Sequence, residues 1–240
     1  MPVRTGSLTA NGCQGTYSAI AAGITWAADH GARIANASYA YLPSSAAVIS
    51  ASNYMKSKGG LVFVGAGNYN RDEGFTPTDS MIAVSATDTV DGKASFSSYG
   101  AFVQLSAPGT NIYTTTRGGG YGMNAGTSFS SPVAAAVGAL VMAANPSLTN
   151  TQVQNILFTT ATDLGAAGRD IYFGYGRVNA AAAVAAAKAM PVADTTAPTV
   201  SIANLTSGST VSGLVSVSVN AADNVGVSRV ELKVNGTVVA

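Results

Sequence analysis

The run Leu-Val-Phe-Val-Gly-Ala-Gly at residues 61–67 limits the choice of fold more than any other segment, because it is almost continuously apolar. A strand with one face in solvent alternates apolar and polar residues, whereas a strand of a parallel sheet is covered on both faces. A helical pattern precedes this run at about 45–58, and a short, mostly apolar segment, 32–38, comes before that helix. Strand, helix and strand in this order predict a right-handed crossover in a parallel sheet.

The remaining patterns extend this sheet and cover it with helices. Further strands are predicted at 81–85 and 102–106, and further helices at 17–30 and at about 129–144, 149–160 and 178–190. The expected fold class is therefore α/β, with a mainly parallel sheet flanked by helices.

The residue pattern changes after residue 190. Residues 191–198 contain two prolines and no periodic pattern, which predicts a linker. Residues 199–240 alternate with period two and contain Asn235-Gly236, a strong signal for a two-residue hairpin. An immunoglobulin-type sandwich needs about 100 residues, so we expect a partial all-β immunoglobulin-like module here. The expected domains are 1–190 and 199–240.

Charge and composition exclude several classes of partner. Charged residues make up 10% of the chain and the net charge is +1, without a basic cluster, so neither nucleic acid nor an anionic membrane is an expected partner. No apolar run reaches the roughly 18 residues of a membrane span. The single cysteine, Cys13, cannot form an internal disulfide and is expected to be a small buried or half-buried residue. Residues 1–20 lack the pattern of a signal peptide, so we expect any export signal to lie outside this chain.

Two polar segments follow predicted strands, and both would open onto one edge of the sheet. Ser38-Tyr39-Ala40 follows the first strand and Gly67-Asn68 follows the second. Ligands of parallel sheets bind beyond the carboxyl ends of the strands. In Gly-Ala-Gly-Asn the glycines allow close backbone approach to a ligand and Asn68 supplies an amide donor. The alternative is an ordinary glycine-rich turn.

Ser128 admits two interpretations as well. Ser-x-x-x-Pro before an alanine-rich run is typical of a helix start, with Ser or Thr as the cap and proline in the first turn. The other interpretation is a nucleophile, because a helix N-terminus favours negative charge developing beside it. A serine there could attack a carbonyl while its own N–H holds the oxyanion.

Several motifs resemble those of subtilisin-family serine proteases, in the same order along residues 2–190. They are "GITWAADHGARIANASYA" (23–40), "GAGN" (65–68), "GTSFSSP" (126–132) and "YFGYGRVNAAAAV" (172–184). The resemblance implies a subtilisin-like fold and a secreted bacterial serine endopeptidase, a hydrolase acting on polypeptides.

The resemblance also implies a role for each matching residue. Ser128 would be the nucleophile, and Asn68 would donate to the oxyanion together with the Ser128 backbone N–H. The substrate-binding residues would be Ser38, Tyr39 and Ala40, which pair with an extended substrate, and Gly65, Ala66 and Gly67, which form one wall of the specificity pocket. Ala40 and Gly65 depart from the family pattern, where glycine and alanine are usual. Neither change removes the nucleophile or the oxyanion donor.

The base that the nucleophile needs is the open question. The family order puts an aspartate and a histidine before the serine. The only histidine, His30, lies at a predicted helix end, where the helix dipole explains it well. We therefore expect the aspartate and histidine upstream of Met1, and little activity in this fragment alone.

The sequence is also compatible with a function other than proteolysis. The alternative to an endopeptidase is a non-catalytic binding or structural protein on the same scaffold, whose β module adheres to a surface or polymer. No cofactor is identified; the resemblance makes calcium the metal to consider, but Asp72, Glu73, Asp88 and Asp91 are expected to be solvated loop carboxylates. The Asn-x-Ser/Thr triplets at Asn36, Asn204 and Asn235 are expected by chance in such a composition.

Overall fold

The computed structural model describes residues 5–9, 12–39, 41–116, 118–191, 194 and 196–240. The chain divides into two compact units, Met1–Val192 and Ala193–Ala240.

A parallel sheet of four strands forms the centre of the first unit. Its strands, in spatial order, are β3 (Ile34–Ala37), β4 (Leu61–Gly65), β5 (Met81–Thr87) and β6 (Val103–Pro108). Neighbours pair in parallel, with Ala35 opposite Val62 and Val62 opposite Met81. The expected α/β fold with a parallel sheet is confirmed.

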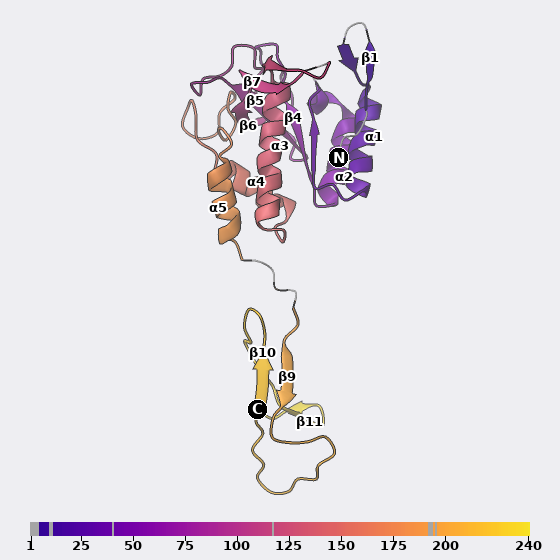
Figure 1. The fold of residues 1–240 in the computed structure, drawn as a ribbon, viewed down its shortest axis with the longest axis vertical. Helices are drawn as coiled ribbons and strands as arrows, with labels where there is room; N and C mark the ends of the chain where they lie inside the picture. The colour runs from indigo at the N-terminus through magenta and orange to yellow at the C-terminus, as the bar shows by residue number, and fades with distance from the viewer. Residues whose placement is uncertain (1–4, 10–11, 40, 117, 192–193, 195) are drawn as a thin grey trace. The chain divides into compact units, whose positions relative to one another are not determined.

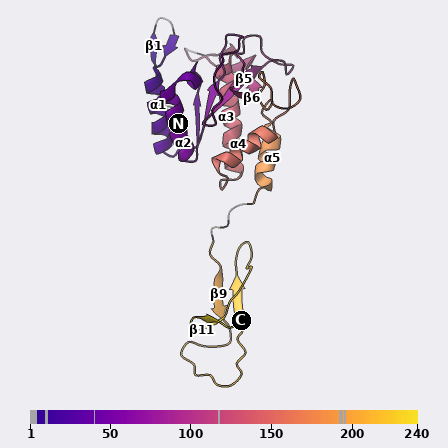
Figure 2. The same cartoon turned by 180° about the vertical axis from the view of Figure 1, so that it is seen from behind.

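Helices cover both faces of this sheet (Figures 1 and 2). One face carries α1 (Tyr17–Asp29) and α2 (Ala46–Ser57). The other carries α3 (Thr127–Ala144), α4 (Asn150–Thr159) and α5 (Ala180–Ala189). A single 3₁₀ turn, η1 (Leu42–Ser44), leads from the sheet into α2.

The apolar run in β4 is explained by these two layers. Leu61 and Phe63 belong to the core formed with α3, α4 and α5. Val62 and Val64 belong to the core formed with α1 and α2. All four side chains are at most 3% exposed. Consecutive apolar residues are needed because successive side chains of a strand enter opposite cores.

Helix α3 is long and apolar enough, by length and composition, to cross a membrane, although we expected no such segment. Half of its residues are buried inside the unit, and it packs against all four strands of the parallel sheet. Its apolar character therefore serves the protein core.

Two short antiparallel hairpins in the first unit were not predicted. They are β1 (Ser7–Thr9) with β2 (Gly12–Gln14), and β7 (Ile112–Thr115) with β8 (Tyr121–Asn124). The turn of the second contains Gly118 and Gly119, both with positive φ. The side chain of Cys13, which we expected to be buried or half-buried, lies outside the described part of the structure.

The second unit is built from short antiparallel pairs. Strand β9 (Thr199–Ile202) pairs with β10 (Val219–Ala222), and β11 (Lys233–Val234) pairs with β12 (Thr237–Val238). The predicted hairpin turn is confirmed, since Asn235 and Gly236 have φ values of 50° and 84°, as a two-residue turn with two left-handed residues requires. The side chains of all four strands are exposed.

Candidate active site

The polar residues predicted from the strand ends come together around one small pocket. Ser38 follows β3, Asn68 follows β4, and Ser128 is the second residue of α3. All three line a pocket of about 50 Å³, together with Tyr39, Gly65, Gly67, Tyr69 and Thr127. The parallel sheet brings the first two to one edge, and α3 begins above that edge. Ala40 lies outside the described residues.

The start of α3 differs from the prediction that a serine or threonine hydroxyl caps it. The capping residue is Gly126, which makes no side-chain cap, and its φ of 148° favours glycine. Instead, Oδ1 of Asn68 accepts hydrogen bonds from the Thr127 backbone N–H at 2.9 Å and from Thr127 Oγ1 at 3.0 Å. The first N–H groups of a helix have no partner within the helix, and here a side chain from another strand end supplies one.

The same bonds fix the orientation of the Asn68 amide. Because Oδ1 is held by Thr127, Nδ2 is left on the other side of the amide group. A Cβ added to Gly126 would lie 3.5 Å from Asn68 Nδ2, 3.7 Å from the backbone N of Ser128 and 3.8 Å from Asn68 Oδ1. Within the described residues neither N–H group has a hydrogen-bond acceptor. Two donors therefore border one space, which the absence of a side chain at Gly126 keeps open.

Pro132 explains how the end of β3 is joined to α3. Proline has no N–H, so the carbonyl of Ser128, four residues earlier, lacks its helical hydrogen bond. The Ser38 hydroxyl donates to this carbonyl at 3.0 Å. Asn36 Nδ2 donates to Ser38 Oγ at 3.0 Å, and Asn36 Oδ1 accepts from Ser131 Oγ at 2.6 Å. Proline lies in the second turn of α3, later than predicted, and its effect is to free a carbonyl for Ser38.

The glycines after β4 allow the strand end to approach α3 closely. The backbone N–H of Gly67 donates to Thr127 Oγ1 at 3.1 Å. A Cβ at Gly65 would lie only 2.9 Å from the same oxygen. Gly65 and Gly67 line the pocket, whereas the side chain of Ala66 is 3% exposed and packs in the core.

His30 lies far from this pocket in the topology. It follows α1, which ends just before β3 begins, so it is at the amino-terminal edge of the sheet, whereas Ser38 is at the carboxyl-terminal edge. Its ring stacks on Trp26 with centroids 3.9 Å apart, and Nδ1 is 2.8 Å from the Trp26 carbonyl oxygen. Because the sequence contains one histidine, no imidazole of this chain is beside Ser128.

The acidic loop residues have partners within the protein. Oδ1 of Asp72 accepts the N–H of Gly74 at 2.8 Å, and Oδ1 of Asp88 accepts two backbone N–H groups. Glu73 and Asp91 form ion pairs with arginines. Within the described ranges, no three acidic, histidine or cysteine side chains gather into one group.

Two residues of the pocket were missed by the sequence prediction. Thr127 is part of the Gly-Thr-Ser-Phe-Ser-Ser-Pro segment and precedes Ser128 directly, so its position in the sequence could have indicated a place in the pocket. Tyr69 follows Asn68, but a tyrosine after a glycine-rich turn carries no pattern that distinguishes a pocket from a surface.

Both parts of the chain match known families. Residues 2–176 match the model of the subtilase family, and residues 198–240 match that of a bacterial Ig domain.

Individual relatives agree with the first match. The chain is 41% identical over 171 residues to alkaline elastase YaB of Bacillus sp. (strain YaB), covering 70% of this chain and 44% of that protein. It is 40% identical over 172 residues to subtilisin BL of Lederbergia lenta, covering 71% of this chain and 63% of that one. The chain thus spans about half the length of these relatives. A solved protease structure from Pseudoalteromonas arctica PAMC 21717 aligns with a TM-score of 0.64 at 30% identity, covering 73% of this chain and 60% of the other.

Proposed function

This chain belongs to the subtilase family, and we propose that it forms part of a serine endopeptidase that hydrolyses peptide bonds through an acyl-enzyme on Ser128. One observation carries the proposal: the backbone N–H of Ser128 and the Nδ2 group of Asn68 border the same open space beside Gly126. Two such donors next to a serine hydroxyl are what the oxyanion of acyl transfer requires.

The proposed reaction begins with attack by Ser128 Oγ on the substrate carbonyl carbon. The carbonyl oxygen becomes negative as the Oγ–C bond forms, and the two N–H groups stabilise that charge. The peptide C–N bond then breaks, the amine leaves with a proton, and water hydrolyses the resulting ester. The hydrogen bond from Thr127 to Asn68 Oδ1 supports this role, because the amide needs no reorientation during the reaction.

We propose that the substrate binds as an extended strand along residues 38–40. Backbone pairing of this kind gives affinity without depending on substrate sequence. The hydrogen bond from the Ser38 hydroxyl to the Ser128 carbonyl supports this proposal. It fixes the position of the substrate-binding segment relative to the nucleophile. The backbone of Gly65, Ala66 and Gly67 would supply the facing wall, with the Ala66 side chain in the core.

The proton acceptor must then come from outside these 240 residues. A serine hydroxyl is a weak nucleophile at neutral pH without an adjacent base, and His30 is held at the other edge of the sheet by Trp26. We propose that an aspartate and a histidine are supplied by another segment, which completes the site. The chain by itself would be inactive.

A second candidate function follows from the position of His30, the only histidine of the chain, at the opposite edge of the sheet from Ser128. A subtilase scaffold without a base beside Ser128 would serve as a non-catalytic binding or structural protein.

We also propose a domain organisation and a location for this protein. Residues 1–190 would carry the site, 191–198 would be a linker, and the immunoglobulin-like residues 199–240 would bind a surface or polymer outside a bacterial cell. The match to a bacterial Ig domain supports the last part.

The test is hydrolysis of a peptide p-nitroanilide by the reconstituted protein, meaning this chain joined to the subtilase segment that supplies aspartate and histidine. Hydrolysis that disappears in Ser128→Ala supports the endopeptidase. Hydrolysis that survives this substitution contradicts it, and a folded reconstituted protein without activity favours the non-catalytic candidate.

A further inference from the structure

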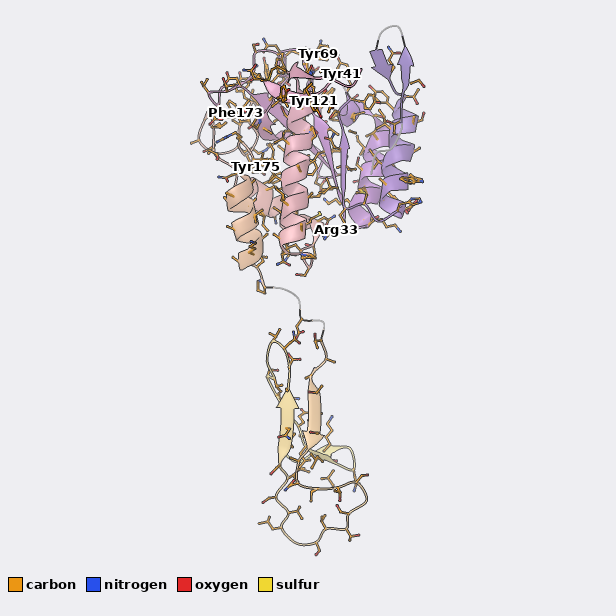
Figure 3. All side chains as sticks on the ribbon, viewed as in Figure 1. Arg33, Tyr41, Tyr69, Tyr121, Phe173 and Tyr175 are labelled. Atoms are coloured by element: carbon orange, nitrogen blue, oxygen red, sulfur yellow. The ribbon has the colours of Figure 1, made fainter. Side chains whose placement is uncertain are left out.

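Two tyrosines join the segments that follow β3 and β4. The rings of Tyr41 and Tyr69 stack with centroids 5.5 Å apart and an interplanar angle of 18°, and Figure 3 shows them side by side. Tyr69 comes directly after Asn68 and lines the pocket. Tyr41 comes directly after the proposed substrate-binding segment, 38–40. The pair therefore connects the two walls between which a substrate side chain would enter.

The backbone of Tyr41 has an unfavourable conformation that its neighbours maintain. Its φ of 60° and ψ of 16° are left-handed, which is an outlier for a bulky residue. Such strain persists where the surroundings determine it, and it is common at ligand clamps. Here Arg71 donates to the Tyr41 hydroxyl at 3.1 Å. The Tyr41 ring also meets the edge of Phe75, which packs in turn on the buried Phe102.

The charged residues beside the pair are already neutralised. The side chain of Glu73 is 3% exposed, and its carboxylate accepts from Arg71 Nε at 3.0 Å and from Ser98 Oγ at 2.8 Å. Ser98 Oγ also accepts the N–H of Tyr69 at 3.1 Å, which fixes the backbone of that tyrosine. A side-chain hydrogen bond with Tyr69 and desolvation raise the pKa of Tyr41. Because the Glu73 carboxylate is held by Arg71 and Ser98, it is not free to select a cationic substrate side chain.

The pocket that Tyr69 and Ser128 line is small. The pocket has a volume of about 50 Å³, whereas a cavity that accepts a benzene ring measures on the order of 150 Å³. While Tyr69 keeps its position, the pocket therefore holds a methyl group more readily than an aromatic ring.

We propose that the stacked Tyr41–Tyr69 pair restricts the specificity pocket, so that the enzyme cleaves after residues with small side chains such as alanine or glycine. This inference rests on the proposed function, because it takes the pocket beside Ser128 as the site for the residue whose carbonyl is attacked, the P1 residue.

The test compares tetrapeptide p-nitroanilides that differ only in alanine or phenylalanine at P1, using the reconstituted protein. The unaltered protein should have the higher kcat/KM for alanine. Tyr41→Gly removes the ring and suits the left-handed backbone. It should shift the ratio of the two kcat/KM values toward the phenylalanine substrate by at least about tenfold, because even one methylene in such a pocket changes selectivity that much. Tyr41→Phe keeps the ring and should leave the ratio unchanged. Tyr69→Ala is a second variant and should shift it as Tyr41→Gly does.

A binding experiment separates this inference from the proposed reaction. Titration of the 240-residue chain with the tetrapeptide acids ending in alanine or phenylalanine, followed by NMR, requires no base. Tighter binding of the alanine peptide that reverses in Tyr41→Gly supports the inference even if the reconstituted protein hydrolyses nothing. Hydrolysis that prefers phenylalanine in the unaltered protein, or a ratio that Tyr41→Gly leaves unchanged, overturns it while the proposed reaction stands.

Discussion

Oδ1 of Asn68 accepts a hydrogen bond from the backbone N–H of Thr127 at 2.9 Å, which ties the loop after β4 to the first turn of α3. The two ends of one amide thus have different tasks. Oδ1 caps the helix, and Nδ2 borders the space beside Gly126. Substitutions that remove one end and keep the other should therefore separate stability from turnover.

Asn68→Ala and Asn68→Asp provide this separation in the reconstituted protein. Both remove the N–H donor, so kcat should fall on the order of 10²- to 10³-fold, the magnitude known for loss of one such donor in a subtilisin, with KM little changed. Only alanine also loses the cap, which should lower the free energy of unfolding by about 1 kcal/mol. Steady-state kinetics and urea unfolding measure the two effects. A rise in KM alone would argue against the oxyanion role.

The contribution of the Ser38–Ser128 hydrogen bond to stability should depend on Pro132. Ser38→Ala leaves the Ser128 carbonyl without its donor, which should cost about 0.5–1.5 kcal/mol of stability. Pro132→Ala restores a backbone N–H that can bond this carbonyl, so Ser38→Ala should cost less in that background. A double-mutant cycle by urea unfolding of the 240-residue chain measures the coupling. Additive effects would show that the carbonyl does not depend on Ser38.

Gly126→Ala should block the space between the two donors. The new Cβ would lie 3.5 Å from Asn68 Nδ2, so turnover of the reconstituted protein should be lost. Gly31→Ala is the matched control, because Gly31 also has a positive φ, 77°, but nothing lies within 4 Å of an added Cβ. Both variants should lose about 1–3 kcal/mol of stability through backbone strain, and the kinetics should differ. Equal turnover in the two would contradict the assignment of this space.

The two units should differ in local stability. Strand β4 is buried along its whole length, whereas the side chains of β9 and β10 are exposed. Few strands with little burial are marginally stable, so backbone amides in 199–240 should exchange faster than those in 61–65 and 131–143. Hydrogen exchange followed by mass spectrometry measures this. Equal protection would mean that the second unit is stabilised by contacts that its own strands do not provide.

Local sequence patterns predicted the elements but not the contacts between them. The apolar run at 61–67 and the turn at Asn235-Gly236 carried enough information, because burial on two faces and a two-residue hairpin leave strong local signals. The cap of α3 was predicted wrongly, since its partner, Asn68, lies 59 residues away from Thr127 in the chain. Tyr41 was not singled out, because its stacking on Tyr69 joins segments that lie apart in the chain.

The direct test of the central claim is labelling with a fluorophosphonate, followed by mass spectrometry to locate the modified residue. The 240-residue chain alone should react negligibly, because removing the histidine from a subtilisin lowers turnover on the order of 10⁶-fold. The reconstituted protein should be labelled at Ser128, and His30→Ala should leave this labelling intact. Labelling of the isolated chain that disappears in His30→Ala would contradict the account, since His30 would then be the base.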